Sequence, residues 1–151
     1  MILQKDIREF IELFLLRRVE FLLVGGYALA CHGAPRFTED IDLLVAVSPG
    51  NAQRLEQALV DFGFGQCGLT ARDFLETNQV IQLGRAPNRI DLLTGLSGVS
   101  WEEAWAGRQP IELDGMPVWM INREALIKNK RATGRPQDLA DVERLVRGRP
   151  S

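Results

Sequence analysis

Two aspartates, Asp40 and Asp42, stand two residues apart at the start of an apolar run that ends at Val47. In an extended strand such residues point to the same side, so the two carboxylates share one face. Their mutual repulsion requires an offset, which a cation, a shared proton or water can supply. A divalent metal ion is the offset that also does chemistry, because carboxylate oxygens are its preferred ligands.

A third carboxylate, Asp91, lies at the start of a second short apolar run, residues 89–93. If the two runs form neighbouring strands, Asp91 stands beside Asp40 and Asp42. Three converging carboxylates bind a pair of Mg²⁺ ions, for which Mn²⁺ can substitute. Two such ions, about 3.5–4 Å apart, clamp the attacking and leaving oxygens of a phosphoryl or nucleotidyl transfer. The three aspartates are therefore the candidate metal ligands and catalytic residues.

The glycine pair Gly25-Gly26 directly follows an apolar run at residues 21–24 and precedes a predicted helix. The start of a helix exposes backbone N–H groups and the positive end of the helix dipole. Glycine also lets a phosphate approach the backbone closely. The pair is a candidate phosphate-binding turn, although an ordinary turn after a strand has the same composition.

The apolar spacing predicts helices and strands in an order typical of an α/β (α+β) fold with a mixed sheet flanked by helices. The length of 151 residues fits one domain, 1–151, with C-terminal helices within 123–147 packed on its core. The expected helices lie at about 4–18, 27–32, from 49, 100–106, 123–133 and 137–146; the expected strands lie at 21–24, 41–47, 80–84, 89–93, 111–113 and 118–121. Residues 86–88 and Asp114-Gly115 are expected to form hairpin turns.

Composition excludes several classes of function. The formal net charge is −2, so the chain as a whole has no polyanion-binding signature, although basic residues exceed acidic ones after residue 122. That excess could face a phosphate or form a solvated helix surface. His32 is the only histidine, which argues against a histidine zinc site and a Ser-His-Asp triad. Cys31 and Cys67 belong to no CxxC motif and are expected to be free thiols.

The charged N-terminus is unlike a signal peptide, and no apolar run approaches the length of about 20 residues that spans a bilayer. Together with the free thiols, these features predict a cytoplasmic protein without a membrane partner.

The glycine pair, Asp40-Ile41-Asp42 and Asp91 follow one another as in the nucleotidyltransferase superfamily typified by DNA polymerase beta, which the chain resembles. Residues 25–45, GGYALACHGAPRFTEDIDLLV, are more specific: they resemble small prokaryotic nucleotidyltransferases related to the abortive-infection toxins of toxin–antitoxin systems. Residues 126–130, LIKNK, and 134–141, GRPQDLAD, resemble that group's lysine followed by RPKDLAD. The resemblance extends over roughly residues 20–146.

The resemblance implies a polymerase beta-like fold and Mg²⁺-dependent transfer of a nucleoside monophosphate. The donor would be a nucleoside triphosphate such as ATP, and the acceptor a hydroxyl of RNA, of a protein or of a small molecule. It implies that Gly25 and Gly26 hold the phosphates through backbone N–H groups. Asp40 and Asp42 would bind both metal ions, while Asp91 would bind one and help to deprotonate the acceptor hydroxyl.

The same resemblance implies that Lys130 contacts the triphosphate, with Lys128 as the second choice. A competing interpretation is that Lys130 only pairs with Asp138 across the break between two helices. Arg36 and Thr38 precede the acidic pair and are expected to orient Asp40 or to touch a phosphate.

Two features depart from the family pattern. The superfamily often has Gly-Ser where this chain has Gly25-Gly26, so the serine hydroxyl is missing. Gln137 stands where the smaller group often has lysine.

Two other functions remain open from the sequence. One is a non-catalytic nucleotide- or partner-binding module of the same fold, because no large acceptor domain accompanies the motifs; an antitoxin-like protein is the expected partner. The other is a glycosyltransferase that uses Asp-x-Asp on a nucleotide sugar. It ranks lower because the glycine pair precedes the acidic pair by one helix and the chain is short.

Overall fold

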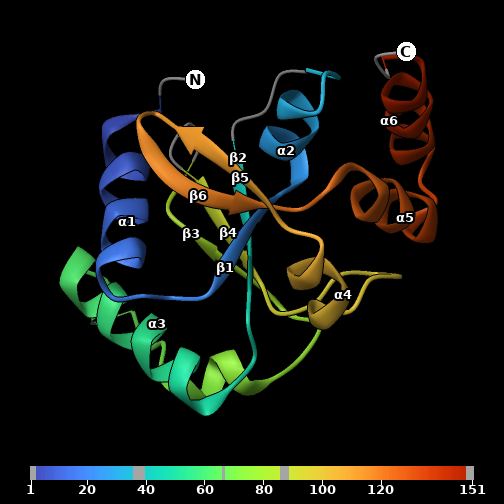
Figure 1. Cartoon of the computed structure of the whole chain (residues 1–151). Helices are drawn as coiled ribbons and strands as arrows, with labels where there is room; N and C mark the ends of the chain where they lie inside the picture. The colour runs from blue at the N-terminus through green and yellow to red at the C-terminus, as the bar shows by residue number, and fades with distance from the viewer. Residues whose placement is uncertain (1–2, 36–39, 66, 86–88, 149–151) are drawn as a thin grey trace.

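The computed structural model of the chain describes residues 3–35, 40–65, 67–85 and 89–148. It is a mixed α/β structure, as the alternation of periodic segments predicts (Figure 1). The elements are α1 (Lys5–Leu16), β1 (Phe21–Val24), α2 (Gly25–Cys31), β2 (Asp40–Val45), α3 (Pro49–Phe62), η1 (Ala71–Leu75), β3 (Val80–Leu83), β4 (Arg89–Leu93), α4 (Trp101–Ala106), β5 (Gln109–Leu113), β6 (Met116–Met120), α5 (Arg123–Thr133) and α6 (Pro136–Arg147).

The strands form one mixed sheet with the order β3-β4-β2-β1-β6-β5. The pairs β2–β4 and β1–β6 are parallel, and the remaining neighbours are antiparallel. The two central strands, β1 and β2, are therefore each enclosed by partners on both sides. This position is consistent with the wholly apolar sequence of β1 and with the apolar run that ends β2, which suit strands covered on both faces.

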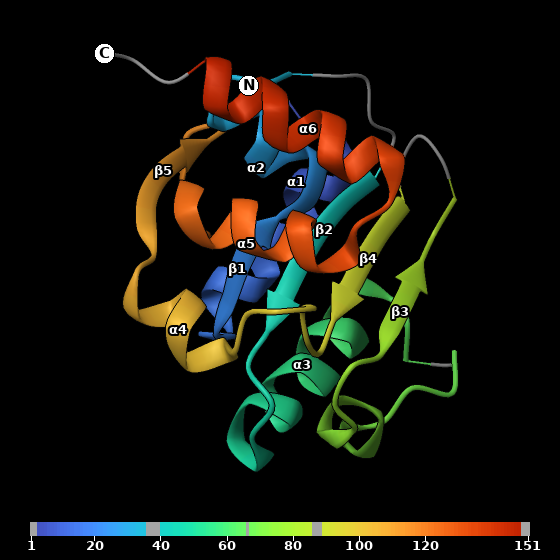
Figure 2. The same ribbon diagram turned by 90° about the vertical axis from the view of Figure 1, so that its right-hand side faces the viewer.

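Helices cover the two faces of the sheet. Helices α1 and α3 lie on one face, and α2, α5 and α6 lie on the other (Figures 1 and 2). The core between α1, α3 and the sheet includes Phe10, Phe14 and Leu55, each at most 1% exposed. Along β2, Ile41 and Leu43 are fully buried, whereas the alternating aspartates face the side of α2.

Several local signals produce the elements that the sequence predicts. Ser48 caps α3 by accepting a hydrogen bond from the Asn51 backbone N–H, and Pro49 occupies the first turn. The helix ends at Gly63, whose φ of 105° only glycine adopts without strain. Between β5 and β6, Asp114 and Gly115 have φ values of 51° and 80°. These positive values match the tight hairpin turn that the Asp-Gly pair predicts.

Most predicted elements match the structure to within about two residues at each end, and two differences affect the site or the order of the elements. Helix α2 begins at Gly25 rather than Tyr27, so the glycine pair is the first turn of the helix itself. The short helix η1 is not predicted, although Thr70 and Asp73 form a capping box at its start. The predicted turn at 86–88 lies outside the described residues. No described helix combines the length and the apolar character needed to cross a membrane.

A buried ion cluster joins α5 to α6. The Lys130 ammonium lies 3.4 Å from Asp138 Oδ1 and 3.0 Å from Asp141 Oδ2, and all three side chains are at most 8% exposed. Asp138 also accepts hydrogen bonds from Arg135 Nε at 2.7 Å and Thr133 Oγ1 at 2.8 Å. Burial by itself would raise the pKa of Asp138, but these bonds and the charge of Lys130 outweigh it and lower the pKa to about 2. The cluster therefore favours ionised Asp138 in the folded chain.

We expect Asp138→Asn to lower the free energy of unfolding at pH 7 by about 1–3 kcal/mol, because charged hydrogen bonds are lost. The folded pKa lies below the ordinary value of 3.8, so this stabilisation is complete above about pH 4. It is lost as the pH falls towards 2. Urea unfolding from pH 7 to pH 2 should show the difference between wild type and variant shrinking below pH 4. Glu143→Gln, an exposed change on the same helix, is the control; a difference that stays constant with pH would contradict the assignment.

Candidate active site

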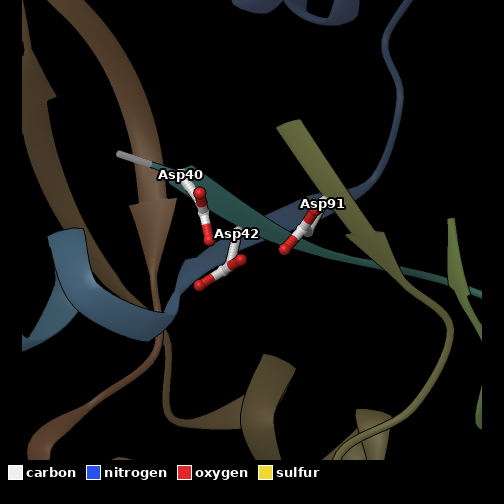
Figure 3. A group of neighbouring side chains, drawn as sticks. All are labelled: Asp40, Asp42 and Asp91. Carbon is white, nitrogen blue, oxygen red and sulfur yellow. The ribbon is translucent and has the colours of Figure 1, made fainter. Parts of the chain in front are cut away.

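The parallel pairing of β2 with β4 brings the three predicted aspartates together. Asp42 is in register with Asp91, and Asp40 lies two residues before Asp42 on the same face of β2. Each of the three offers a carboxylate oxygen within 4.8 Å of the others. Figure 3 shows the carboxyl groups gathered on one side of the two strands, with Asp42 between Asp40 and Asp91. An all-oxygen donor set of this kind fits Mg²⁺ or Mn²⁺ rather than a softer metal.

The crowding of these carboxyl groups changes the protonation of Asp42. Burial, the negative charge of Asp91, a hydrogen bond with Asp91 and the charge of Asp40 raise the pKa of Asp42 from 3.8 to about 7. The positive charge of Arg89 opposes this rise in part. Without a metal ion, Asp42 therefore retains a proton up to near neutral pH, as one member of a close carboxyl group does.

Arg89 is in register with Asp40 and brings a positive charge into direct contact with the cluster. Its Nη2 lies 2.8 Å from Asp40 Oδ2 and 3.1 Å from Asp91 Oδ2. Its Nε donates to Asp91 Oδ1 at 3.2 Å. One guanidinium thus bridges two of the three carboxylates.

Gly25 forms the wall of the site opposite β4. The antiparallel register places Val24 beside Asp42, so the next residue, Gly25, begins α2 directly against the carboxylate. A Cβ at Gly25 would lie 1.9 Å from Asp42 Oδ2, and the backbone φ there is 68°. Both the close approach and the left-handed backbone therefore require glycine. Gly26, the second residue of the pair, is buried.

A cleft of ≈ 390 Å³ opens beside the carboxylates. Its wall includes Gly25, Gly26, Asp42, Asn129, Lys130 and Arg135. A larger cavity of ≈ 800 Å³ shares Asn78, Gly95 and Leu96 with the cleft but is lined by none of the three aspartates. Because the cleft is the one of these two that joins the glycine pair to a carboxylate, it is the candidate nucleotide site.

The basic residues near the cleft are already engaged. Lys130 faces the cleft but is 7% exposed and held by Asp138 and Asp141, so it forms the ion pair that the sequence leaves open as an alternative role. Lys128 pairs instead with Glu103 at 2.9 Å. Arg135 lines the cleft with a side chain that is 76% exposed, although its Nε bonds to Asp138.

Two basic residues near the site have no role assigned from the sequence alone. Arg89 precedes Asp91 by two positions, so the same alternation that pairs Asp40 with Asp42 places it on the side of the three carboxylates. Arg135 directly follows the glycine that ends α5, and only the turn between α5 and α6 brings it to the cleft. The predicted contacts of Arg36 and Thr38 lie outside the described residues.

Solved structures with a similar fold are nucleotidyltransferases. The lincosamide antibiotic adenylyltransferase LnuA, bound to lincomycin, matches with a TM-score of 0.58 and 13% identity, over 96% of this chain and 97% of that one. A putative nucleotidyltransferase from Thermotoga maritima matches with a TM-score of 0.58 and 13% identity, over 94% and 91% of the two chains. ANT(2'')-Ia in complex with adenylyl-2''-tobramycin matches with a TM-score of 0.58 and 15% identity, over 93% and 86%. At these identities the likeness establishes the fold.

No curated protein sequence matches the chain significantly. A sequence profile described as "Nucleotidyl transferase AbiEii toxin, Type IV TA system" matches residues 15–114, which is more than half of the chain and includes the glycine pair and all three aspartates. The chain therefore belongs to the AbiEii nucleotidyltransferase toxin family.

Proposed function

We propose that the protein is a Mg²⁺-dependent nucleotidyltransferase that moves a nucleoside monophosphate from a nucleoside triphosphate to an acceptor hydroxyl and releases pyrophosphate. Family membership indicates nucleotidyl transfer as the chemistry. The observation that carries the proposal is the convergence of Asp40, Asp42 and Asp91 within 4.8 Å, directly against Gly25. A glycine wall and three carboxylates suit a phosphate that is held beside divalent cations.

In this proposal Asp40 and Asp42 hold both metal ions, and Asp91 holds one. When bound, Mg²⁺ supplies Lewis-acid stabilisation of the negative charge that develops on the transferred phosphate. Asp91 is 7% exposed, so its carboxylate is shielded from water and is suited to accept the proton of an acceptor hydroxyl that binds next to it. Asp42 lies between the other two (Figure 3), and the register of β2 with β4 sets their separation.

We further propose that Gly25 and Gly26 hold the triphosphate through their backbone N–H groups, since both glycines line the cleft at the start of α2 and neither has a side chain to cover its backbone. Arg135 is better suited than Lys130 to contact the phosphates, because its guanidinium is exposed at the cleft while Lys130 is buried in its ion pairs. Arg36 and Thr38 are kept as phosphate-binding or Asp40-orienting residues on the family resemblance.

The proposed location, protein partner and acceptor of the enzyme are based on its family and its structural neighbours. We propose a cytoplasmic enzyme with an antitoxin-like protein partner, in which residues 1–151 act as one catalytic unit. Among the structural neighbours, LnuA is lincomycin-bound and ANT(2'')-Ia is bound to adenylyl-2''-tobramycin, so small molecules join RNA and protein hydroxyls as candidate acceptors. ATP is the first donor to test.

A second candidate is a nucleotide-binding module of the same fold without catalysis. The observation that favours it is the occupation of Asp40 and Asp91 by the Arg89 guanidinium, which leaves the metal ligands engaged.

We expect Asp42→Asn and Asp40→Ala to lower metal-dependent nucleotide affinity at least about tenfold, because each removes a ligand shared by both ions. Calorimetric titration of each nucleoside triphosphate with Mg²⁺ measures this, and Asp6→Asn, an exposed change on α1, is the control. Equal binding by wild type and both variants would contradict the metal site. Tight, Asp42-dependent binding with no label transferred from α-³²P triphosphates to any component of a cell lysate would support the non-catalytic module instead.

We expect Gly25→Ala to abolish metal-dependent nucleotide binding, because the new methyl group displaces the Asp42 carboxylate. Gly33→Ala is a matched control: Gly33 also has a positive φ, 93°, but no atom lies within 4 Å of the position that a methyl group would take there. Both variants should lose about 1–2 kcal/mol of stability from backbone strain in urea unfolding. Only Gly25→Ala should lose binding; similar losses of binding in both would show that strain, rather than the contact with Asp42, is responsible.

We expect the affinity for Mn²⁺ to fall by up to about tenfold per pH unit below pH 7, because a bound cation must displace the proton of Asp42. The sign follows from the raised pKa: Asp42 is protonated below about 7 and ionised above it. Calorimetry in two buffers of different ionisation enthalpy should detect proton release at pH 6 and almost none at pH 8. Unchanged proton release at the two pH values would contradict the assignment, and Asp42→Asn should remove the inflection.

A further inference from the structure

The guanidinium of Arg89 contacts carboxylate oxygens of Asp40 and Asp91, which are proposed ligands of a metal ion. Its Nη2 bridges Asp40 Oδ2 at 2.8 Å and Asp91 Oδ2 at 3.1 Å, and its Nε bonds to Asp91 Oδ1 at 3.2 Å. The strand register fixes this arrangement, since Arg89 is directly opposite Asp40 and two residues before Asp91. The position of the guanidinium therefore follows from the pairing of β2 with β4, which fixes the backbone of Arg89 next to both carboxylates.

The contact differs from an ordinary surface ion pair in burial and geometry. The Arg89, Asp40 and Asp91 side chains are 34%, 28% and 10% exposed. Arg89 grips Asp91 through two nitrogens and both carboxylate oxygens, the fork arrangement that makes arginine–carboxylate pairs strong. Isolated exposed pairs contribute little, whereas a two-pronged, half-buried pair that also serves a second carboxylate has a larger effect.

A guanidinium and a divalent cation compete for the same oxygens. Both need the negative charge of Asp40 and Asp91, and the presence of one positive charge lowers the affinity of the site for another. The hydrogen bonds of the Arg89 guanidinium within the cluster go to Asp40 and Asp91. A metal ion that binds all three carboxylates must therefore displace the guanidinium from two of them, Asp40 and Asp91.

We propose that Arg89 is an internal counter-ion that occupies the carboxylate cluster in the nucleotide-free protein and makes metal binding depend on the nucleotide. The proposal rests on the metal site of the proposed function. A metal ion must displace the guanidinium from Asp40 and Asp91, and the released Arg89 then needs a new anionic partner. The triphosphate supplies that partner, so the affinities for metal and nucleotide rise together, as linkage requires.

The test is Mn²⁺ binding followed by electron paramagnetic resonance at pH 8, first without nucleotide. We expect Arg89→Gln to bind Mn²⁺ at least about fivefold more tightly than wild type, the low end of ordinary coupling between bound groups. Arg85→Gln is the matched control, because it removes the same charge from an exposed position in the segment that follows β3. Arg89→Lys keeps the charge but lacks the fork and should fall between wild type and Arg89→Gln.

The second half of the test adds the α,β-methylene analogues of the four nucleoside triphosphates in separate titrations. In wild type the analogue that binds should tighten Mn²⁺ binding, and in Arg89→Gln this enhancement should shrink at least about fivefold. Circular dichroism and thermal melts establish that each variant is folded.

Three results decide the outcome. Tighter metal-only binding in Arg89→Gln than in Arg85→Gln, with reduced enhancement by nucleotide, supports the counter-ion. Equal or weaker binding in Arg89→Gln overturns it, while loss of binding in Asp42→Asn still upholds the metal site. Mn²⁺ binding that is unaffected by Asp42→Asn overturns the metal site itself and the counter-ion with it.

Discussion

The parallel pairing of β2 with β4 in a single register is the constraint on which the candidate site depends. That register sets Asp42 beside Asp91 and Asp40 beside Arg89. A slip by one residue would turn the polar side chains of one strand to the opposite face. The slip is prevented by packing, because Ile90 lies 3% exposed on the other face of β4 and could not exchange places with a carboxylate without exposing the core. Apolar side chains that take no part in the chemistry therefore specify its geometry.

The close approach of the three carboxylates lowers the stability of the folded chain. Three carboxylates within 4.8 Å repel one another, and partial burial removes the water that would screen them. Without metal, the chain offsets the repulsion with the guanidinium of Arg89 and with a proton on Asp42. The other buried carboxylates, Asp138 and Asp141, are offset instead by the charges of Lys130 and Arg135. Sites that gain function from such crowding commonly do so at the expense of folding free energy.

The parts of the site that the sequence predicts are those governed by local periodicity. Alternation along a strand places Asp40 with Asp42, and the glycine pair marks the end of a strand. The neighbour relation between β2 and β4 is not local, since about fifty residues separate Asp40 from Arg89, and only the resemblance to a family supports it in advance. The partners of Lys130 are likewise undecided from the sequence, because the turn at Gly134 determines which carboxylates of α6 reach the lysine. Helix η1 escapes prediction although its capping box is visible in the sequence.

Two ion clusters each contribute residues to the lining of the same cleft, Asp42 from one and Lys130, Arg135 and Asp138 from the other, and they differ in charge balance. In the cluster between α5 and α6, two positive side chains, Lys130 and Arg135, pair with the carboxylates of Asp138 and Asp141. The buried members of the cluster pair with one another. The charges within this cluster balance, and its effect is to hold α5 against α6. At the strand ends, within the described part of the chain, one arginine faces three carboxylates, so negative charge remains even when Asp42 is protonated. Because uncompensated negative charge attracts a cation, the cluster on β2 and β4 is the one that can bind a metal ion. The cluster between α5 and α6 has a structural role, because it holds together the two helices that form one wall of the cleft.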